Sequence, residues 1–303
     1  MVGSAVAKGV PVATIEPLGK QRRRTDGLLW RLTRNRMLLF WGAVLLALVL
    51  MAIFAPIIAP YDPIKQSGDL LKPPSRHYLF GTDELGRDVL SRIIFGARIS
   101  LTVGLIAVGI AGSVGTIVGL VSGFFGGMVD AITMRIIDVL MAFPGIILAI
   151  LIMATLGASL INVMVAVGIS AIPWYARTVR GATLAVREND YIFSARALGA
   201  TPGHIMYRHV LPNVVGPVVV LATVGIAGAI LAISGLSYLG LGAKPPSPEW
   251  GAMLSQSRVY LRKAWWITTF PGLAIMVSVF SINLIGDALR DALDPQLRGA
   301  IKD

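Results

Sequence analysis

The sequence predicts an all-α polytopic membrane protein with six transmembrane helices. Hydrophobic residues make up 55% of the 303 positions and charged residues only 14%, whereas a typical soluble domain carries about 25% charged residues. The mean hydropathy is +0.74. Because so little charge is available to cover a water-exposed surface, most of the chain is predicted to lie in lipid.

Six segments are long and apolar enough to cross the hydrocarbon core, which takes about 20 residues at 1.5 Å each. These segments are 37–59, 98–125, 134–157, 160–179, 211–236 and 265–289. The first could be read as a cleaved signal peptide. However, it is too long for a signal's apolar region, and its Ala-Pro pairs make a poor cleavage site. It is therefore predicted to remain as a span.

The lysines and arginines orient these spans. With a cytoplasmic N-terminus, the inner segments hold 17 of the 27 basic residues and the outer segments hold 10. Basic residues favour the cytoplasmic side, so both termini are predicted to be cytoplasmic. The net charge of +11 is then explained by basic flanks that contact anionic lipid head groups. No nucleic-acid partner is predicted.

The spans divide the chain into four parts. Residues 1–36 form a cytoplasmic tail, in which 25–36 are either an interfacial helix or a plain basic flank. Residues 37–97 hold the first span and an outer loop. Residues 98–289 form the core, and residues 290–303 form a second cytoplasmic tail.

A polar segment of 27 residues, 187–213, separates the fourth and fifth spans. A short helix around 189–198 is predicted to end at Gly199, because glycine adopts the left-handed conformation that closes a helix. A second helix is predicted to begin with Thr201 as N-cap and Pro202 at its first position. Such a helix–glycine–helix elbow is well shaped to dock into another protein.

The sequence offers no chemistry for catalysis. It has no cysteine and only three histidines, and His77, His204 and His209 lack the paired spacing of a metal site. No catalytic residue and no metal site are predicted, which disfavours a membrane enzyme. No G-x-x-x-x-G-K-[ST] motif is present, so any ATP must bind to another chain.

Several features inside the spans concern helix packing. Asp138 is predicted to pair with Arg135 on its own helix. Glycines at 115, 119 and 123 form a stripe that suits close helix packing. Proline is predicted to kink three spans around a cavity. The three positions are Pro144, Pro173 and Pro271.

Four motifs carry a resemblance to a known family. They are F-G-T-D-E-L-G-R-D-V-L-S-R-I-I-F-G-A-R-I-S-L at 80–101, the segment 187–213, L-S-Y-L-G-L-G-A-K-P-P-S-P-E-W-G-A-M-L at 236–254 and I-N-L-I-G-D-A-L-R-D-A-L-D-P at 282–295. Together they resemble the C-type inner-membrane permease of dipeptide and oligopeptide ABC importers, over residues 26–298. The resemblance implies a type I ABC importer transmembrane domain over 98–289, with 187–213 as its cytoplasmic coupling-helix loop.

The resemblance also implies a function and partners. The chain would be the permease subunit of an ATP-driven, binding-protein-dependent importer in the cytoplasmic membrane of a prokaryote. Dipeptides are the first expected solute and oligopeptides the second. The implied partners are a homologous second permease, two ATPase subunits and an extracytoplasmic substrate-binding protein. This chain would bind no cofactor, since ATP and Mg would sit on the ATPases. The alternative is a stand-alone secondary transporter or channel, but no internal repeat or acidic relay supports it.

The resemblance assigns candidate coupling residues in the loop 187–213. They are Ser194, Ala195, Arg196, Ala197, Leu198, Gly199, Ala200 and Pro202. The family pattern Glu-Ala-Ala, three residues, Gly departs here, because Phe193-Ser194-Ala195 precede Gly199. Arg196 is therefore predicted to supply the polar contact.

Two outer motifs are candidate contacts for an extracytoplasmic partner. Their residues are Gly86, Arg87, Asp88, Glu249 and Trp250. The alternative for Gly86–Asp88 is a capped turn with a local salt bridge. For the second motif, the alternative is a rigid surface loop with Trp250 as an anchor at the membrane interface.

Overall fold

The computed structural model describes residues 36–293, and this range is helical apart from loops and one isolated bridge between Thr82 and Asp88. The helices, in chain order, are α2 (Arg36–Ile53), α3 (Ala55–Ile58), α4 (Val89–Phe125), α5 (Gly127–Met141), α6 (Gly145–Leu156), α7 (Leu160–Arg187), α8 (Asp190–Ala197), α9 (Pro202–Ile205), a π-helical turn (Met206–Val210), α10 (Leu211–Tyr238), α11 (Trp250–Ser257), a 3-10 turn (Arg258–Tyr260) and α12 (Trp266–Leu293). Predictions for residues 1–35 and 294–303, including both tails, lie outside the described range.

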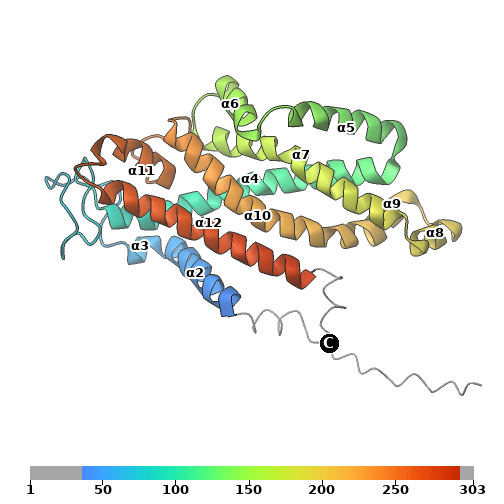
Figure 1. Cartoon of the computed structure of the whole chain (residues 1–303), viewed down its shortest axis with the longest axis horizontal. Coiled ribbons are helices and arrows are strands. Elements are labelled where there is room, and N and C mark those ends of the chain that lie inside the picture. The colour runs from blue at the N-terminus through green and yellow to red at the C-terminus, as the bar shows by residue number, and fades with distance from the viewer. Residues whose placement is uncertain (1–35, 294–303) are drawn as a thin grey trace, which may run out of the picture.

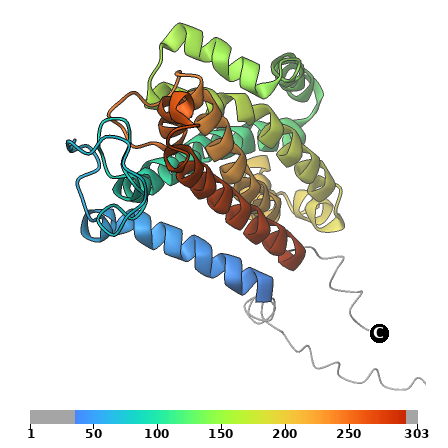
Figure 2. The same cartoon turned by 60° about the vertical axis from the view of Figure 1, so that its left-hand side comes forward.

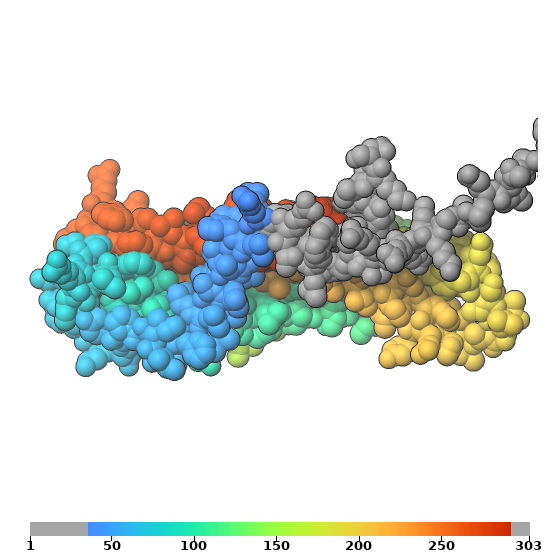
Figure 3. All heavy atoms as spheres, turned by 90° about the horizontal axis from the view of Figure 1, so that it is seen from below, coloured from blue at the N-terminus to red at the C-terminus, as the bar shows by residue number. Residues whose placement is uncertain are grey.

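The long helices form an elongated bundle (Figure 1). α8 and α9 lie at one end, whereas α11 and the loop before α4 lie at the other. Figure 3 shows the same two ends from below, with the outer loop in cyan and the α8–α9 region in yellow. Figure 2 shows α2 lying beside α12, where the rings of Trp41 and Phe280 are 4.8 Å apart between centroids.

Within residues 36–293, five helices are long and apolar enough to cross a membrane. A sixth crossing requires α5 and α6 together, and these two helices meet at 89°. The predicted span 134–157 thus corresponds to a bent pair of helices, and the kink predicted at Pro144 is a complete break between α5 and α6. Pro144 has an extended ψ of 132° and immediately precedes α6, so it lies at a full helix break. Pro173 and Pro271 lie inside the continuous helices α7 and α12.

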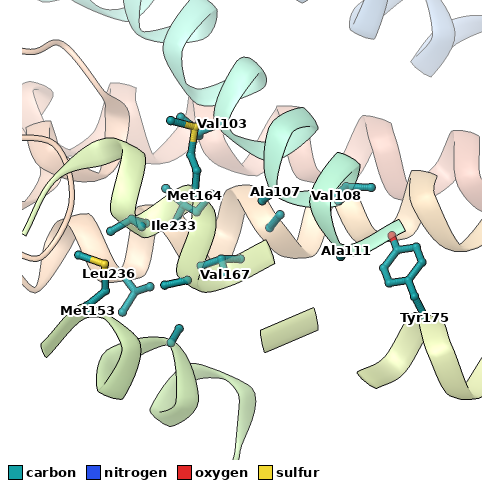
Figure 4. Close-up of a cluster of buried hydrophobic side chains, with 14 residues drawn as sticks. Val103, Ala107, Val108, Ala111, Met153, Met164, Val167, Tyr175, Ile233 and Leu236 are labelled. Carbon is teal, nitrogen blue, oxygen red and sulfur yellow. The ribbon is translucent and has the colours of Figure 1, made fainter. Parts of the chain in front are cut away.

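The core of the bundle lies where α4, α7, α10 and α6 meet (Figure 4). The predicted close packing of the glycine stripe is confirmed. A Cβ at Gly115, Gly119 or Gly123 would lie less than 3.0 Å from atoms of α7. The side chains that face the stripe include Tyr175 and Thr183. The missing side chains thus let the α4 and α7 backbones approach closely.

Two span boundaries differ from the prediction. α4 begins at Val89, because Asp88 caps its first turn by accepting a hydrogen bond from the backbone N–H of Ser91. α7 continues to Arg187, past the predicted end at 179. Both helices therefore extend beyond their apolar segments and carry polar residues at their ends.

Candidate functional site

The segment 187–213 forms the elbow predicted from its sequence. α8 ends at Ala197, and Gly199 has φ +84°, the left-handed conformation expected of it. The backbone N–H of Gly199 donates to the carbonyl of Arg196 at 2.9 Å. The Thr201 hydroxyl accepts from the N–H of His204 at 3.4 Å, and Pro202 is the first residue of α9. The residues that end α8 and begin α9 thus adopt the conformations predicted from the local sequence.

The second short helix differs from the prediction in how it ends. α9 continues through the π-helical turn directly into α10, so residues 202–238 form one helical run. Only Glu188 and Asn189 separate α7 from α8. The elbow therefore joins two long helices with almost no flexible linker.

Buried side chains fasten the elbow to the bundle. Ile192 of α8 and Ile205 of α9 are fully enclosed in a cluster with Phe124 of α4 and Val179 of α7. The Arg187 guanidinium donates to two carbonyls at the end of α4, at 3.2 and 3.4 Å. A rigid-body displacement of the elbow would therefore carry the attached helix ends with it.

The outward face of the elbow is apolar and aromatic. Leu198 is 89% exposed and Tyr207 is 73% exposed. Phe193 and Tyr191 are also exposed. Of the other predicted coupling residues, Ser194, Arg196, Ala197, Gly199 and Pro202 are exposed, and Ala195 and Ala200 are partly buried. Tyr191 and Tyr207 were not among the predicted residues, although aromatic residues in a polar segment are a usable signal. An exposed apolar patch of this kind is typical of a contact with a protein or a membrane.

Two ion pairs join α5 to α7. The Arg180 guanidinium donates to both carboxylate oxygens of Asp130 at 2.5 Å, and the Ser122 hydroxyl adds a third hydrogen bond. This pair was not predicted from the sequence. Asp138 pairs with Arg177 at 2.5 Å, so the predicted pairing with Arg135 is wrong. Arg177 reaches Asp138 because α7 lies alongside α5.

The segment Gly86–Asp88 forms the capped turn that was the alternative to a partner contact. Arg87 is buried, and its guanidinium contacts Asp83 at 2.6 Å and Glu84 at 3.1 Å. Asp88 accepts hydrogen bonds from the N–H and hydroxyl of Ser91, at 2.7 and 2.6 Å. Gly86 has φ +74° and is itself buried. This segment is a capped turn with a local salt bridge.

Glu249 and Trp250 are also enclosed by the chain itself. The Glu249 carboxylate accepts from the N–H groups of Gly251 and Ala252, at 2.9 and 2.8 Å. Its burial raises the pKa of this carboxyl group. The Trp250 indole N–H donates to the carbonyl of Ile93 at 3.1 Å.

All five predicted outer-contact residues are therefore buried. Asp88 and Trp250 bond to α4, whereas Arg87 and Glu249 bond within the outer loops and α11, so the polar side chains are directed into the chain itself. The prediction of direct contact is corrected to a supporting role. The physical reason is that their polar atoms are hydrogen-bonded inside the fold, where an unpaired polar group would be costly.

The chain matches two family models. Residues 115–299 match the binding-protein-dependent transport system inner membrane component, and residues 26–74 match the N-terminal transmembrane domain of oligopeptide transport permease C. Among solved structures, a subunit of the MetNI methionine ABC transporter in an inward-facing conformation aligns with a TM-score of 0.56 at 20% identity. That alignment covers 67% of this chain and 96% of the other, and it supports the fold alone.

Curated relatives agree with the family models. The di/tripeptide transport system permease protein DppC of Pseudomonas aeruginosa is 46% identical over 84% of this chain and 87% of its own length. DppC of Alkalihalophilus pseudofirmus is 43% identical over 88% of both chains. The glutathione transport system permease protein GsiD of Escherichia coli is 46% identical over 89% of this chain and 90% of its own. The chain belongs to the family of binding-protein-dependent transport system inner-membrane components, the permease subunits of ABC importers.

Proposed function

We propose that this chain is the permease subunit of an ATP-driven importer of peptides, with dipeptides as the first expected solute and oligopeptides as the second. The observation that carries the proposal is the elbow at 187–213, a rigid projection with an exposed apolar tip at Leu198. The named dipeptide permeases among the relatives support the solute class. The equally similar glutathione permease carries a modified peptide and fits the same class.

In this proposal the chain works with three kinds of partner. A homologous second permease completes the pathway, and an extracytoplasmic binding protein delivers the peptide. Two ATPase subunits bind ATP and Mg, and one of them receives the elbow in a surface cleft. This chain itself binds no cofactor and catalyses no reaction.

The coupling follows from how the elbow is attached. When the ATPase pair closes around ATP, the cleft moves and carries the elbow with it. α7 and α10 leave the elbow almost without a linker, so they move as rigid bodies and reorient the pathway. The residues that transmit this movement are Ser194, Ala195, Arg196, Ala197, Leu198, Gly199, Ala200 and Pro202.

The elbow also fixes the proposed orientation. It must face the cytoplasm to reach the ATPases. α2 begins and α12 ends toward the end of the bundle that carries α8 and α9 (Figure 1). Both termini are therefore proposed to be cytoplasmic, in agreement with the distribution of basic residues.

The test is Leu198→Asp in the complete complex reconstituted into liposomes. Leu198 is 89% exposed, so the change costs little folding energy, but it places a charge in the proposed apolar contact. Peptide uptake should be lost, while ATP hydrolysis continues without stimulation by the loaded binding protein. Val259→Asp is the matched control, because Val259 is 73% exposed at the other end of the bundle. Normal uptake by Leu198→Asp would refute the coupling role. Uptake driven by an ion gradient without ATP would favour a secondary transporter.

A further inference from the structure

The break between α5 and α6 lies inside a segment that is, as one bent pair, long and apolar enough to cross the membrane. α5 holds 15 residues, or about 22 Å of helix, before the chain turns by 89°. Ala142, Phe143 and Pro144 at the turn are exposed, and no side chain caps the first turn of α6. Irregular backbone at this depth is tolerated only against protein or water, because lipid offers no hydrogen-bond partner. The exposed side of the break therefore does not face lipid.

An ion pair in the last turns of α5, near the break, leads to the same conclusion. Asp138 lies one turn before the end of α5, and the side chains of Asp138 and Arg177 are 53% and 51% exposed. The second pair between these helices, Asp130 and Arg180, is more enclosed, at 18% and 31%. Charged groups inside a membrane protein normally face water or protein, because exposure to lipid is costly. The half-exposed pair thus opens toward a polar space.

Trp174 provides a third observation on α7. It lies one turn from Arg177 and is 60% exposed. The predicted apolar span of α7 ends at 179, five residues or about 8 Å of helix beyond Trp174. The exposed indole thus lies toward one end of the span and adds aromatic surface beside the ion pair.

We propose that four residues near the break between α5 and α6 line the solute pathway and contact the peptide in transit. These residues, here called the patch, are Asp138, Phe143, Trp174 and Arg177. The inference rests on the proposed function for the identity of the solute. A free peptide is a zwitterion, so its ammonium group is complementary to Asp138 and its carboxylate to Arg177. The two aromatic rings offer apolar surface to side chains of any kind. The patch therefore fits a pathway that accepts peptides without reading their sequence.

The first test uses the absence of cysteine from the chain. Phe143→Cys and Trp174→Cys are made separately in the complete complex, with cysteine-free partner subunits, and exposed to a membrane-impermeant cationic methanethiosulfonate. Leu46→Cys on α2 is the control, since Leu46 is 58% exposed on an apolar helix. The patch cysteines should react at least about tenfold faster than the control, and a saturating dipeptide in the transport assay should slow them.

Three results are decisive. Reaction rates equal to that of Leu46→Cys, both without nucleotide and in the ATP-trapped state, would overturn the assignment of the patch to the pathway. Fast labelling without protection, in a complex that still imports dipeptides, would overturn the contact with peptide. A wild-type complex that imports no peptide would refute the proposed function instead, while the labelling rates would still decide whether the patch faces water.

The second test concerns the two charges. The double variant Asp138→Asn with Arg177→Gln keeps a neutral hydrogen-bonding pair, so neither helix is left with an unpaired charge. Its maximal rate of dipeptide uptake should fall about tenfold, the contribution of roughly one charged hydrogen bond. Its half-saturating peptide concentration should be unchanged, since the binding protein captures the solute. An unchanged maximal rate, with normal assembly of the complex, would overturn the role of the charges.

Discussion

The glycine stripe of α4 allows a prediction whose size follows from the structure. In Gly119→Ala, the new Cβ would lie 2.8 Å from the Cβ of Val179, 2.9 Å from the N of Arg180 and closer still to the Ala176 carbonyl oxygen. Backbone atoms cannot rotate away, so α4 and α7 must separate. Overpacking of this kind costs up to about 3 kcal/mol, whereas alanine gains only about 1 kcal/mol in helix propensity over glycine. The net loss of folding free energy should be about 2 kcal/mol.

Gly109→Ala is the matched control for this change. Gly109 lies on the same helix, but a Cβ there would meet no atom within 4 Å, so only the gain of about 1 kcal/mol in helix propensity remains. The two variants should therefore differ by about 3 kcal/mol. At roughly 2–4 °C per kcal/mol, their melting temperatures in the purified complex should differ by about 6–12 °C, with Gly119→Ala the lower. If Gly119→Ala melts at or above Gly109→Ala, the helices are not in the close contact described.

Three further predictions use the same thermal measurement. Asp130→Asn should lower the free energy of unfolding by about 2 kcal/mol, less than the 3–5 kcal/mol of a fully buried pair, because its partner Arg180 is 31% exposed. The loss should exceed that of Asp138→Asn, and a loss no greater than that would contradict the prediction. Because burial raises the pKa of Glu249, folding favours its protonated form. The stability of the wild type relative to Glu249→Gln should then fall as pH rises above about 4.3 through the higher folded pKa, and a flat difference between pH 4 and 8 would oppose it. Trp250→Phe should lose about 1 kcal/mol with its indole hydrogen bond, and an unchanged melting temperature would show that this bond adds nothing.

The elbow was predictable because its signals are local. A glycine that closes one helix and a Thr-Pro pair that opens the next act through their own backbone and immediate neighbours. Gly199 and Thr201 therefore adopt the predicted conformations. The sequence could not indicate that α9 would join α10, because this depends on Ile205 entering a cluster with residues of α4 and α7.

The outer residues were misread because burial is a tertiary property. Arg87, Glu249 and Trp250 are charged or aromatic residues, and the sequence predicted that they contact a partner. Asp83, only four residues from Arg87, satisfies the guanidinium, but the contact with Gln256 bridges 169 positions. No local pattern indicates that such a distant loop will cover the charge. Asp138 was misassigned for the same reason, since Arg177 is 39 residues away and its register against α5 is set by packing.

The break at Pro144 shows that packing, and not the local sequence alone, decides whether a proline interrupts a helix. Pro144-Gly145 and Pro271-Gly272 are the same dipeptide in apolar surroundings, yet the first lies at an 89° break and the second inside a continuous helix. α12 packs against α2, α10 and α11, so its neighbours keep the helix continuous despite the hydrogen bond that proline removes. Within α5, by contrast, Ile137 is the one buried residue, and the helix is attached to α7 largely through two ion pairs. Because so little packing opposes it, the loss of a backbone hydrogen bond at Pro144 interrupts the helix completely. The polar backbone that is exposed at this break is best accommodated at a water-filled pathway.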